Sequence, residues 1–250
     1  MNYNDIIEKI DSNNHMISMV PVEKIIEMGY LLKCNKNTKI LDLCCGYGEM
    51  LKILNQAYSV SGKGIDISKE FITEGNKRFV DSNMSNKIML ECNDVLDCTE
   101  TGYDIVICTE PYLFGDIENA IRKLEKHITP TGKIVIGTLV TKEKNIPQEL
   151  IDFDGNNLHT EYEIYETFLK CNYAVSYIGR STQGEWDKYF AWSSQRIIKD
   201  YQLSETNAEK QKQMEWLIKW HKMYSKYRIK YEQWCLYAFE KIDLSENFSF

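Results

Sequence analysis

The sequence predicts an α/β fold in which a seven-stranded, mostly parallel sheet carries helices on both faces. Two observations predict it. Short apolar segments of strand length alternate with longer segments of helical periodicity along the 250 residues, as in sheets built from strand–helix–strand units. The stretch ILDLCCGYGEM (40–50) also reads as the end of a buried strand, a tight glycine turn and the start of a helix, which is the layout of a nucleotide-binding unit.

The elements of the first half are assigned from the period of their apolar residues. Helices have apolar side chains three or four positions apart, and strands are short apolar runs between polar residues. Ser68 is well placed as the N-cap of its helix. In chain order we expect a helix at 18–33, a strand at 38–43, a helix from 48, a strand at 62–67, a helix at 68–83 and a strand at 86–92.

The second half continues the alternation and then departs from it. Asp116 is the expected cap of a helix, and the glycine of the segment TPTGKIVIGTLV marks a turn before a strand. A long helical stretch rich in Trp and Tyr then separates the last two strands. In order we expect a strand at 103–109, a helix at 116–128, a turn and strand at 129–140, a helix at 160–171, a strand at 173–180, helices over 182–231 and a strand at 231–242.

Composition excludes several classes of protein. The net charge is −7 and no basic cluster is visible, whereas proteins that bind nucleic acids usually present a basic face. The eight cysteines form no C-x-x-C pair and the four histidines are scattered, so no metal site is expected. No apolar run is long enough to span a bilayer, and the first residues are polar and acidic rather than a targeting signal. A cytoplasmic location is therefore the expectation.

The turn after the first strand disfavours a dinucleotide. A G-x-G-x-x-G loop directs backbone N–H groups at a pyrophosphate, but here Leu51 stands where the third glycine belongs, and Asp42 would repel a phosphate. A ligand with an ammonium group and a sulfonium, such as S-adenosylmethionine, would instead be attracted by Asp42. Gly46 and Gly48 would allow the backbone to approach its methionyl chain and ribose.

Two further acids follow the next two strands. Asp66 stands 20 residues after Gly46 (66 − 46), where an acid that accepts hydrogen bonds from ribose hydroxyls is expected. Asp94 follows the third strand and can accept from an adenine amino group, while Val95 can pack on the ring. Three acids at the carboxyl ends of successive strands predict one acidic crevice.

These segments resemble the motifs of class I S-adenosylmethionine-dependent methyltransferases. ILDLCCGYG is similar to the first motif (Asp-x-Gly-x-Gly-x-Gly), GKGIDIS to the second, CNDVLD to the third and YDIVICTEPYLFGD to the fourth, and ITPTGKIVIG is similar to the turn before strand five. The chain departs from the first motif at Cys44, which replaces the first glycine. The resemblance implies a Rossmann-like fold, and it extends through HMISMVPVEKIIEMGYLLK, GEWDKYFAW and RIKYEQWCLYAF to a bacterial subgroup that methylates small molecules.

The resemblance also implies an organisation and a set of site residues. The chain would be a single methyltransferase domain (1–250), with an N-terminal helical cap (1–33), a cofactor-binding core (34–181), a helical lid insertion (182–231) and a final strand (232–243). The residues expected to bind S-adenosylmethionine are Asp42, Cys44, Gly46, Gly48, Asp66, Ile67, Asn93, Asp94, Val95 and Thr109.

Residues after the fourth strand are the first candidates for the chemistry. Glu110 could deprotonate or bind a cationic acceptor, or else contact only the cofactor or solvent, and Tyr112 could pack on or hydrogen-bond the substrate. His15 is a second candidate base, with a lid contact or simple exposure as the alternative. Trp186 and Tyr189, at the start of the aromatic-rich stretch, are expected to line the acceptor pocket.

The leading hypothesis is a methyltransferase that uses S-adenosylmethionine to methylate a small molecule by in-line displacement. An RNA or protein methyltransferase, a non-catalytic nucleotide-binding protein and an NAD-dependent oxidoreductase are the alternatives. The acceptor atom is left open, as is the choice between a monomer and a homodimer. No nucleic-acid or membrane partner is expected.

Overall fold

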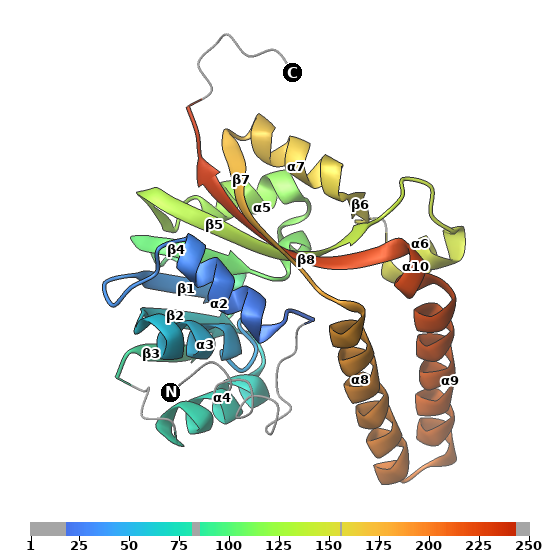
Figure 1. The fold of residues 1–250 in the computed structure, drawn as a ribbon. Coiled ribbons are helices and arrows are strands. Elements are labelled where there is room, and N and C mark those ends of the chain that lie inside the picture. Colours follow the sequence, from blue (N-terminus) through green and yellow to red (C-terminus); the bar gives the residue numbers. More distant parts are fainter. Residues whose placement is uncertain (1–18, 82–85, 156, 244–250) are drawn as a thin grey trace.

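The central feature of the computed structural model, which describes residues 19–81, 86–155 and 157–243, is one mixed sheet (Figure 1). Its main strands lie in the order β3-β2-β1-β4-β5-β8-β7, and the two-residue strand β6 pairs with β5. The predicted α/β class is therefore confirmed. The strands are β1 (Lys39–Leu43), β2 (Ser61–Asp66), β3 (Ile88–Cys92), β4 (Tyr103–Cys108), β5 (Ile128–Thr141), β6 (His159–Thr160), β7 (Tyr173–Arg180) and β8 (Glu232–Lys241).

Strand direction follows from the connections between strands. β1 pairs in parallel with β2 and β4, and β4 pairs in parallel with β5. A helix returns the chain across the sheet after β1, β2 and β4, and the segment with the short 3₁₀ turn Val95–Asp97 does so between β3 and β4. β8 is antiparallel to both of its neighbours, β5 and β7. The pair of helices after β7 returns the chain to the end of the sheet at which β7 finishes. β8 must therefore run antiparallel to β7.

Helices cover both faces of the sheet. α2 (Val22–Leu31), α3 (Glu49–Tyr58) and α4 (Lys69–Asp81) pack on one face, and α5 (Ile117–Leu124) and α7 (Glu161–Lys170) pack on the other. Strand residues alternate between the two cores: Ile40 belongs to the α2–α4 side, and Leu41 to the α5–α7 side. Because both faces are covered, the central strands are apolar throughout rather than alternating with polar residues.

A pair of long antiparallel helices projects from the sheet between β7 and β8 (Figure 1). We call this segment, residues 183–231, the arm. It contains α8 (Gln183–Leu203), α9 (Asn207–Met223), a π-helical turn (Tyr224–Arg228) and the single turn α10 (Ile229–Tyr231). Thr182 with Glu185 and Thr206 with Glu209 form capping boxes at the starts of the two long helices. The proposed role of this stretch as a lid stays a prediction.

The base of the arm is held by a buried ion-pair cluster. Arg228 is 6% exposed, contacts the carboxylate of Asp154 at the end of α6 (Gln148–Asp154), and lies 3.5 Å from Glu232 at the start of β8. Its guanidinium also lies over the rings of Phe153 and Trp220. The end of the arm is thereby joined to the element that follows β5.

Element boundaries differ from expectation in the second half. The helix expected over 116–128 ends at Leu124, and β5 already begins at Ile128, so the expected turn lies inside the strand. His127 lies in the connection, with its Nδ1 2.5 Å from the carbonyl oxygen of Glu100. The helix α6 was not expected. Within the described residues, no helix has both the length and the apolar character needed to cross a membrane.

Gly137 on β5 leaves room for the Trp234 ring of the neighbouring strand β8, and a methyl group there should destabilise the protein. A Cβ at this position would lie 2.6 Å from the ring of Trp234 on β8 and 2.9 Å from the Thr109 methyl. We expect Gly137→Ala to lower the free energy of unfolding by about 1–3 kcal/mol, measured by urea unfolding.

Gly184 provides the matched control for that substitution. Its nearest neighbour to an added Cβ is the Thr182 hydroxyl at 3.6 Å, and it lies in the first turn of α8, where alanine favours the helix. Gly184→Ala should therefore leave stability unchanged or raise it. An equal loss in both variants would show that the Trp234 contact is not the cause.

Candidate active site

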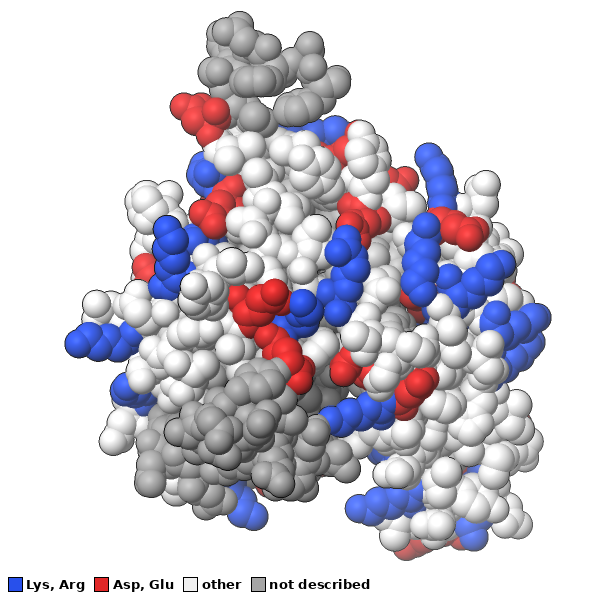
Figure 2. Space-filling view, in the orientation of Figure 1, with Lys and Arg blue, Asp and Glu red and all other residues white. Residues whose placement is uncertain are grey.

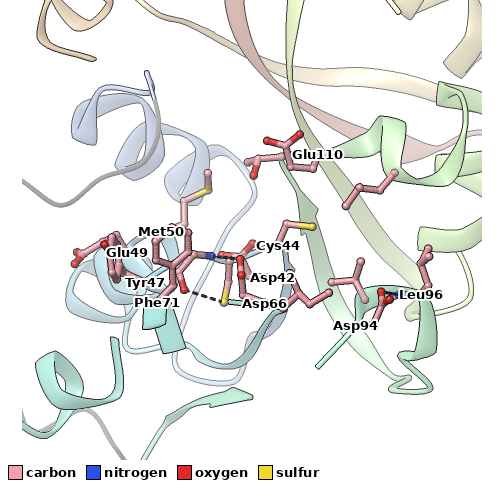
Figure 3. A pocket seen from close by; sticks show the side chains of 16 residues that line it. Asp42, Cys44, Tyr47, Glu49, Met50, Asp66, Phe71, Asp94, Leu96 and Glu110 are labelled. Carbon is pink, nitrogen blue, oxygen red and sulfur yellow. Dashed lines mark hydrogen bonds between the residues drawn. The ribbon is translucent and has the colours of Figure 1, made fainter. Parts of the chain in front are cut away.

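A cavity of about 420 Å³ opens at the carboxyl ends of the parallel strands. This is the edge at which open α/β sheets bind ligands. Its walls come from the loop after β1, the ends of β2 and β4, the turn after β3 and the first turn of α3 (Figure 3). Among the residues expected to bind a cofactor, those that line it are Asp42, Cys44, Gly46, Asp66, Ile67, Asp94, Val95 and Thr109.

The loop between β1 and α3 is shaped by left-handed backbone conformations. Cys44, Gly46 and Gly48 have φ values of +65°, +56° and +75°. This region of φ is open to glycine and costly for other residues. The first position of the motif therefore requires a glycine-like backbone, although a cysteine occupies it. The N–H groups of Cys44 and Cys45 donate to the carbonyl of Ile65 at 2.8 and 3.1 Å, which ties the loop to β2.

Gly48 serves packing and is not part of the cavity wall. A Cβ there would lie 2.8 Å from both Leu90 on β3 and Phe79 on α4. The residue lets the start of α3 approach these side chains. It is thus placed next to the cavity without lining it.

Asp66 joins the two loops that bound the cavity. Its Oδ2 accepts a hydrogen bond from the N–H of Gly46 at 2.8 Å, and its Oδ1 accepts one from the N–H of Ser68 at 2.8 Å. The first of these bonds is drawn in Figure 3. Each carboxylate oxygen has further lone pairs after one such bond, so the carboxylate is fixed in place yet can still accept from a ligand.

Asp42 is a buried carboxyl group in the cavity wall. It is 2% exposed, and among the described residues it has no hydrogen-bond or ion-pair partner. Burial, with the nearby charge of Asp66 as a second cause, raises its pKa from 3.8 to about 8. A cationic ligand beside Asp42 would offset this cost of burial and favour the ionised form.

Glu110 and Asp94 lie on separate parts of the rim, as Figure 3 shows. Asp94 caps a short 3₁₀ turn, η1 (Val95–Asp97), because its Oδ1 accepts from the N–H of Leu96 at 2.9 Å. Glu110 follows β4, and its carboxylate has no partner among the described residues. Its pKa is raised, first by desolvation in the hollow and then by the charge of Asp66.

Several other candidates lie outside the cavity. Tyr112 stacks on His159 with ring centroids 6.1 Å apart, and it packs on the α5–α7 side of the sheet. Trp186 is 5% exposed and belongs to the core on the opposite side of the sheet, and Tyr189 packs against that core. Asn93 is exposed, and its amide donates to Glu91. His15 lies outside the described residues.

The structure adds cavity residues that the sequence did not indicate. They are Cys45, Tyr47, Glu49, Met50, Phe71, Leu96 and Leu113. Glu49 is compensated by Arg78 at 2.9 Å and Lys52 at 3.5 Å, and Arg78 also lies 4.1 Å from the ring centroid of Tyr47. The contacts of Arg78 reach from α4 to Glu49 and Tyr47 over a long sequence distance, so no local sequence pattern indicates them.

The electrostatics of this cavity favour cations. Its ionisable walls include the carboxyl groups of Asp42, Glu49, Asp66, Asp94 and Glu110, and no Lys, Arg or His lines it within the described parts of the chain. A phosphate group would meet only like charges here. A ligand with an ammonium or sulfonium group would be attracted.

Comparisons with known proteins agree with this geometry. A family described as "Methyltransferase domain" matches residues 34–214, more than half of the chain. The phosphoethanolamine N-methyltransferase of Plasmodium falciparum is 31% identical over 118 residues, which cover 45% of this chain and 43% of that enzyme. The uncharacterized protein YjhP of Escherichia coli is 25% identical over 187 residues, covering 70% of this chain and 73% of YjhP.

A solved structure has the same fold over nearly the whole chain. The SAM-dependent methyltransferase of Geobacter sulfurreducens, crystallised with S-adenosyl-L-homocysteine, superposes with a TM-score of 0.84 at 20% identity. The match covers 91% of this chain and 94% of that one. At this identity the likeness speaks for the fold alone.

Replacing Cys44 with glycine should stabilise the protein. The φ of +65° costs a non-glycine residue about 1–2 kcal/mol, which glycine would not lose. Glycine also makes the unfolded chain more flexible, and this offsets roughly half of the stabilisation. We expect Cys44→Gly to raise the free energy of unfolding by up to about 1 kcal/mol, seen as a higher denaturant midpoint at an unchanged slope. Cys45→Gly, at a neighbouring position without positive φ, should lower it; a loss in both variants would contradict the assignment.

The contribution of Asp42 to the stability of the ligand-free protein should fall as the pH rises from about 4 to 8. The pKa of Asp42 is about 8 in the folded protein, above its unfolded value of 3.8, so the folded state binds an extra proton between these values. The group's contribution to the free energy of unfolding therefore decreases by up to about 1.4 kcal/mol per pH unit as the pH rises. Asp42→Asn should remove this part of the slope in urea unfolding curves recorded across that range. The slope should persist in the control Asp104→Asn, because Asp104 lies at the start of β4, at the end of the strand opposite the cavity.

Proposed function

This chain belongs to the class I S-adenosylmethionine-dependent methyltransferases, and we propose that it uses S-adenosylmethionine to methylate a small molecule. The observation that carries the proposal is the buried, unpartnered carboxyl group of Asp42 in an acidic cavity at the carboxyl edge of the sheet. A buried acid of this kind is costly unless a cation approaches it. The ammonium of the methionyl group is such a cation.

The other cavity residues fit the remaining parts of this cofactor. Asp66 is fixed by two backbone N–H groups and retains acceptor capacity for ribose hydroxyls. Ile67 and Leu96 are 73% and 55% exposed, as apolar side chains on the cavity wall. A flat, weakly polar ring bound against these residues would cover their exposed apolar surface. We assign them, with Val95, to the adenine, and Asp94 to its amino group.

Methyl transfer requires little covalent chemistry from the protein. When bound, the cofactor supplies an electrophilic methyl group on its sulfonium. The residues of this chain would hold the acceptor in line with it and exclude water, effects that together can be worth roughly 7–11 kcal/mol. Thr109, Glu110 and Leu113, which follow β4, line the part of the cavity left for the acceptor.

The surface charge favours a small acceptor over an RNA. Figure 2 shows Lys and Arg interspersed with Asp and Glu on the visible described surface, without the basic area that RNA binding needs. The relative that methylates phosphoethanolamine matches over less than half of its length, so its acceptor is not carried over to this chain.

Calorimetry with S-adenosylhomocysteine tests the cofactor assignment. We expect the wild-type chain to bind it and not NAD, and Asp66→Ala to weaken binding about tenfold or more, because charge-assisted hydrogen bonds to the ribose are lost. The matched control is Asp104→Ala, since Asp104 also accepts from a backbone N–H, that of Lys39 at 2.8 Å, but lies far from the cavity. Unchanged affinity in Asp66→Ala would contradict the ribose role. Absence of binding in the wild type would contradict the proposal itself.

A further inference from the structure

Tyr47, in the loop after β1, packs against one face of α4. Its ring centroid lies 4.8 Å from that of Phe71, and the guanidinium carbon of Arg78 lies 4.1 Å from it. Phe71, Gly75 and Arg78 follow one another at intervals of four and three residues, so they share a face of the helix. A Cβ on Gly75 would lie 2.6 Å from the carbonyl oxygen of Tyr47. This glycine therefore allows the loop backbone to contact α4.

Two carboxylates fix the side chain of Arg78. Its Nη1 lies 2.9 Å from Oε1 of Glu49, the first residue of α3, and its Nε lies 3.0 Å from Oε1 of Glu74, one turn earlier on α4. The side chains of Arg78 and Glu49 are 11% and 8% exposed, so salt screens this ion pair little. A guanidinium that bonds carboxylates at its edge can still present its flat face to an aromatic ring. Arg78 thus connects α4 both to the loop and to the start of α3.

Tyr47 is the residue through which these contacts reach the cofactor cavity. Tyr47 and Phe71 line the cavity, and Arg78 is not part of its described lining. The residue before Tyr47 is Gly46, whose N–H donates to the carboxylate of Asp66 at 2.8 Å. The contact with α4 therefore acts on the same loop that the proposed function places against the ribose and the methionyl chain. Figure 3 shows Tyr47 on the side of the cavity away from Asp94.

We infer that Arg78 is a positioning residue for the cofactor, because it holds the Tyr47 ring in the orientation that forms the cavity wall. The inference rests on the proposed function and extends it to a residue outside the segments that resemble the family's motifs. When a loop samples several orientations, the apparent affinity falls with the fraction of molecules that are competent to bind. The contact with Arg78 raises this fraction before the ligand binds.

Calorimetry with S-adenosylhomocysteine tests the role of Arg78. Arg78→Met keeps the aliphatic stem but loses the guanidinium, and it should bind about three- to tenfold more weakly than the wild type. Arg78→Lys keeps a cation near Glu49 but loses the planar group, so it should also bind more weakly. The control is Arg122→Met on α5, since Arg122 is likewise paired with a glutamate four residues earlier but does not line the cavity. The control should keep wild-type affinity.

A double-mutant cycle tests whether Arg78 acts through Tyr47. Tyr47→Ala removes the ring from the cavity wall and should itself weaken the binding of S-adenosylhomocysteine. Adding Arg78→Met to Tyr47→Ala should cause little further loss, because no ring is left to position. A loss from Arg78→Met that is equally large with and without the ring would overturn the inference. It would then be assigned to Glu49 or to the charge of Arg78.

A comparison of two ligands separates positioning from a direct effect of charge. S-adenosylmethionine carries a sulfonium where S-adenosylhomocysteine has a neutral thioether. Removal of a nearby cation would raise the affinity for the charged ligand relative to the neutral one. Loss of positioning should instead weaken both by the same factor. A several-fold shift of the ratio towards S-adenosylmethionine in Arg78→Met would contradict the positioning role.

Gly75→Ala tests the same contact without a change of charge. Alanine favours the helix over glycine, but its Cβ would meet the Tyr47 carbonyl and displace the loop. We expect weaker binding of S-adenosylhomocysteine by a variant that keeps a cooperative urea unfolding transition. Unchanged affinity in Gly75→Ala or in Arg78→Met would overturn the inference, while binding by the wild type keeps the proposed function. Absence of binding by the wild type would remove both.

Discussion

The hydrogen bonds of one carboxylate, Asp66, determine the shape of the site. By accepting from the N–H of Gly46 and from the N–H of Ser68, this side chain fixes the loop after β1 relative to the loop after β2. The two loops belong to neighbouring strands, so the distance between them is set by the sheet. The cavity is the space that these fixed loops leave, and the left-handed turn at Gly46 is what brings its N–H to the acid.

The site is acidic at a cost to the folded protein. Asp42 is buried without a partner, and its raised pKa measures how strongly the surroundings oppose its charge. Cys44 adds a second local cost, because its backbone has a conformation that suits glycine. Both residues line the same cavity. The hydrophobic cores on the two faces of the sheet compensate for the stability that is lost at Asp42 and Cys44.

The sequence was sufficient to predict the fold because its signals are local. Apolar runs mark the strands, and acids at the ends of three strands must meet at one edge of a parallel sheet. The sequence could not indicate that Tyr47, Glu49 and Phe71 complete the cavity wall, since that depends on how α3 and α4 pack together. Tyr112 shows the reverse case: it follows β4 closely, but its ring lies on the α5–α7 side, where His159 stacks on it.

The position of β8 has a consequence for how the chain is assembled. Among the strands that the structure describes, β7 pairs only with β8, and β8 lies between β7 and β5. During synthesis, β7 and the whole arm must emerge before the strand that attaches them to the sheet exists. Until then the free edge of β5 is an open template for pairing with other chains. Completion of the sheet therefore depends on contacts between residues far apart in sequence, a feature of slow-folding topologies.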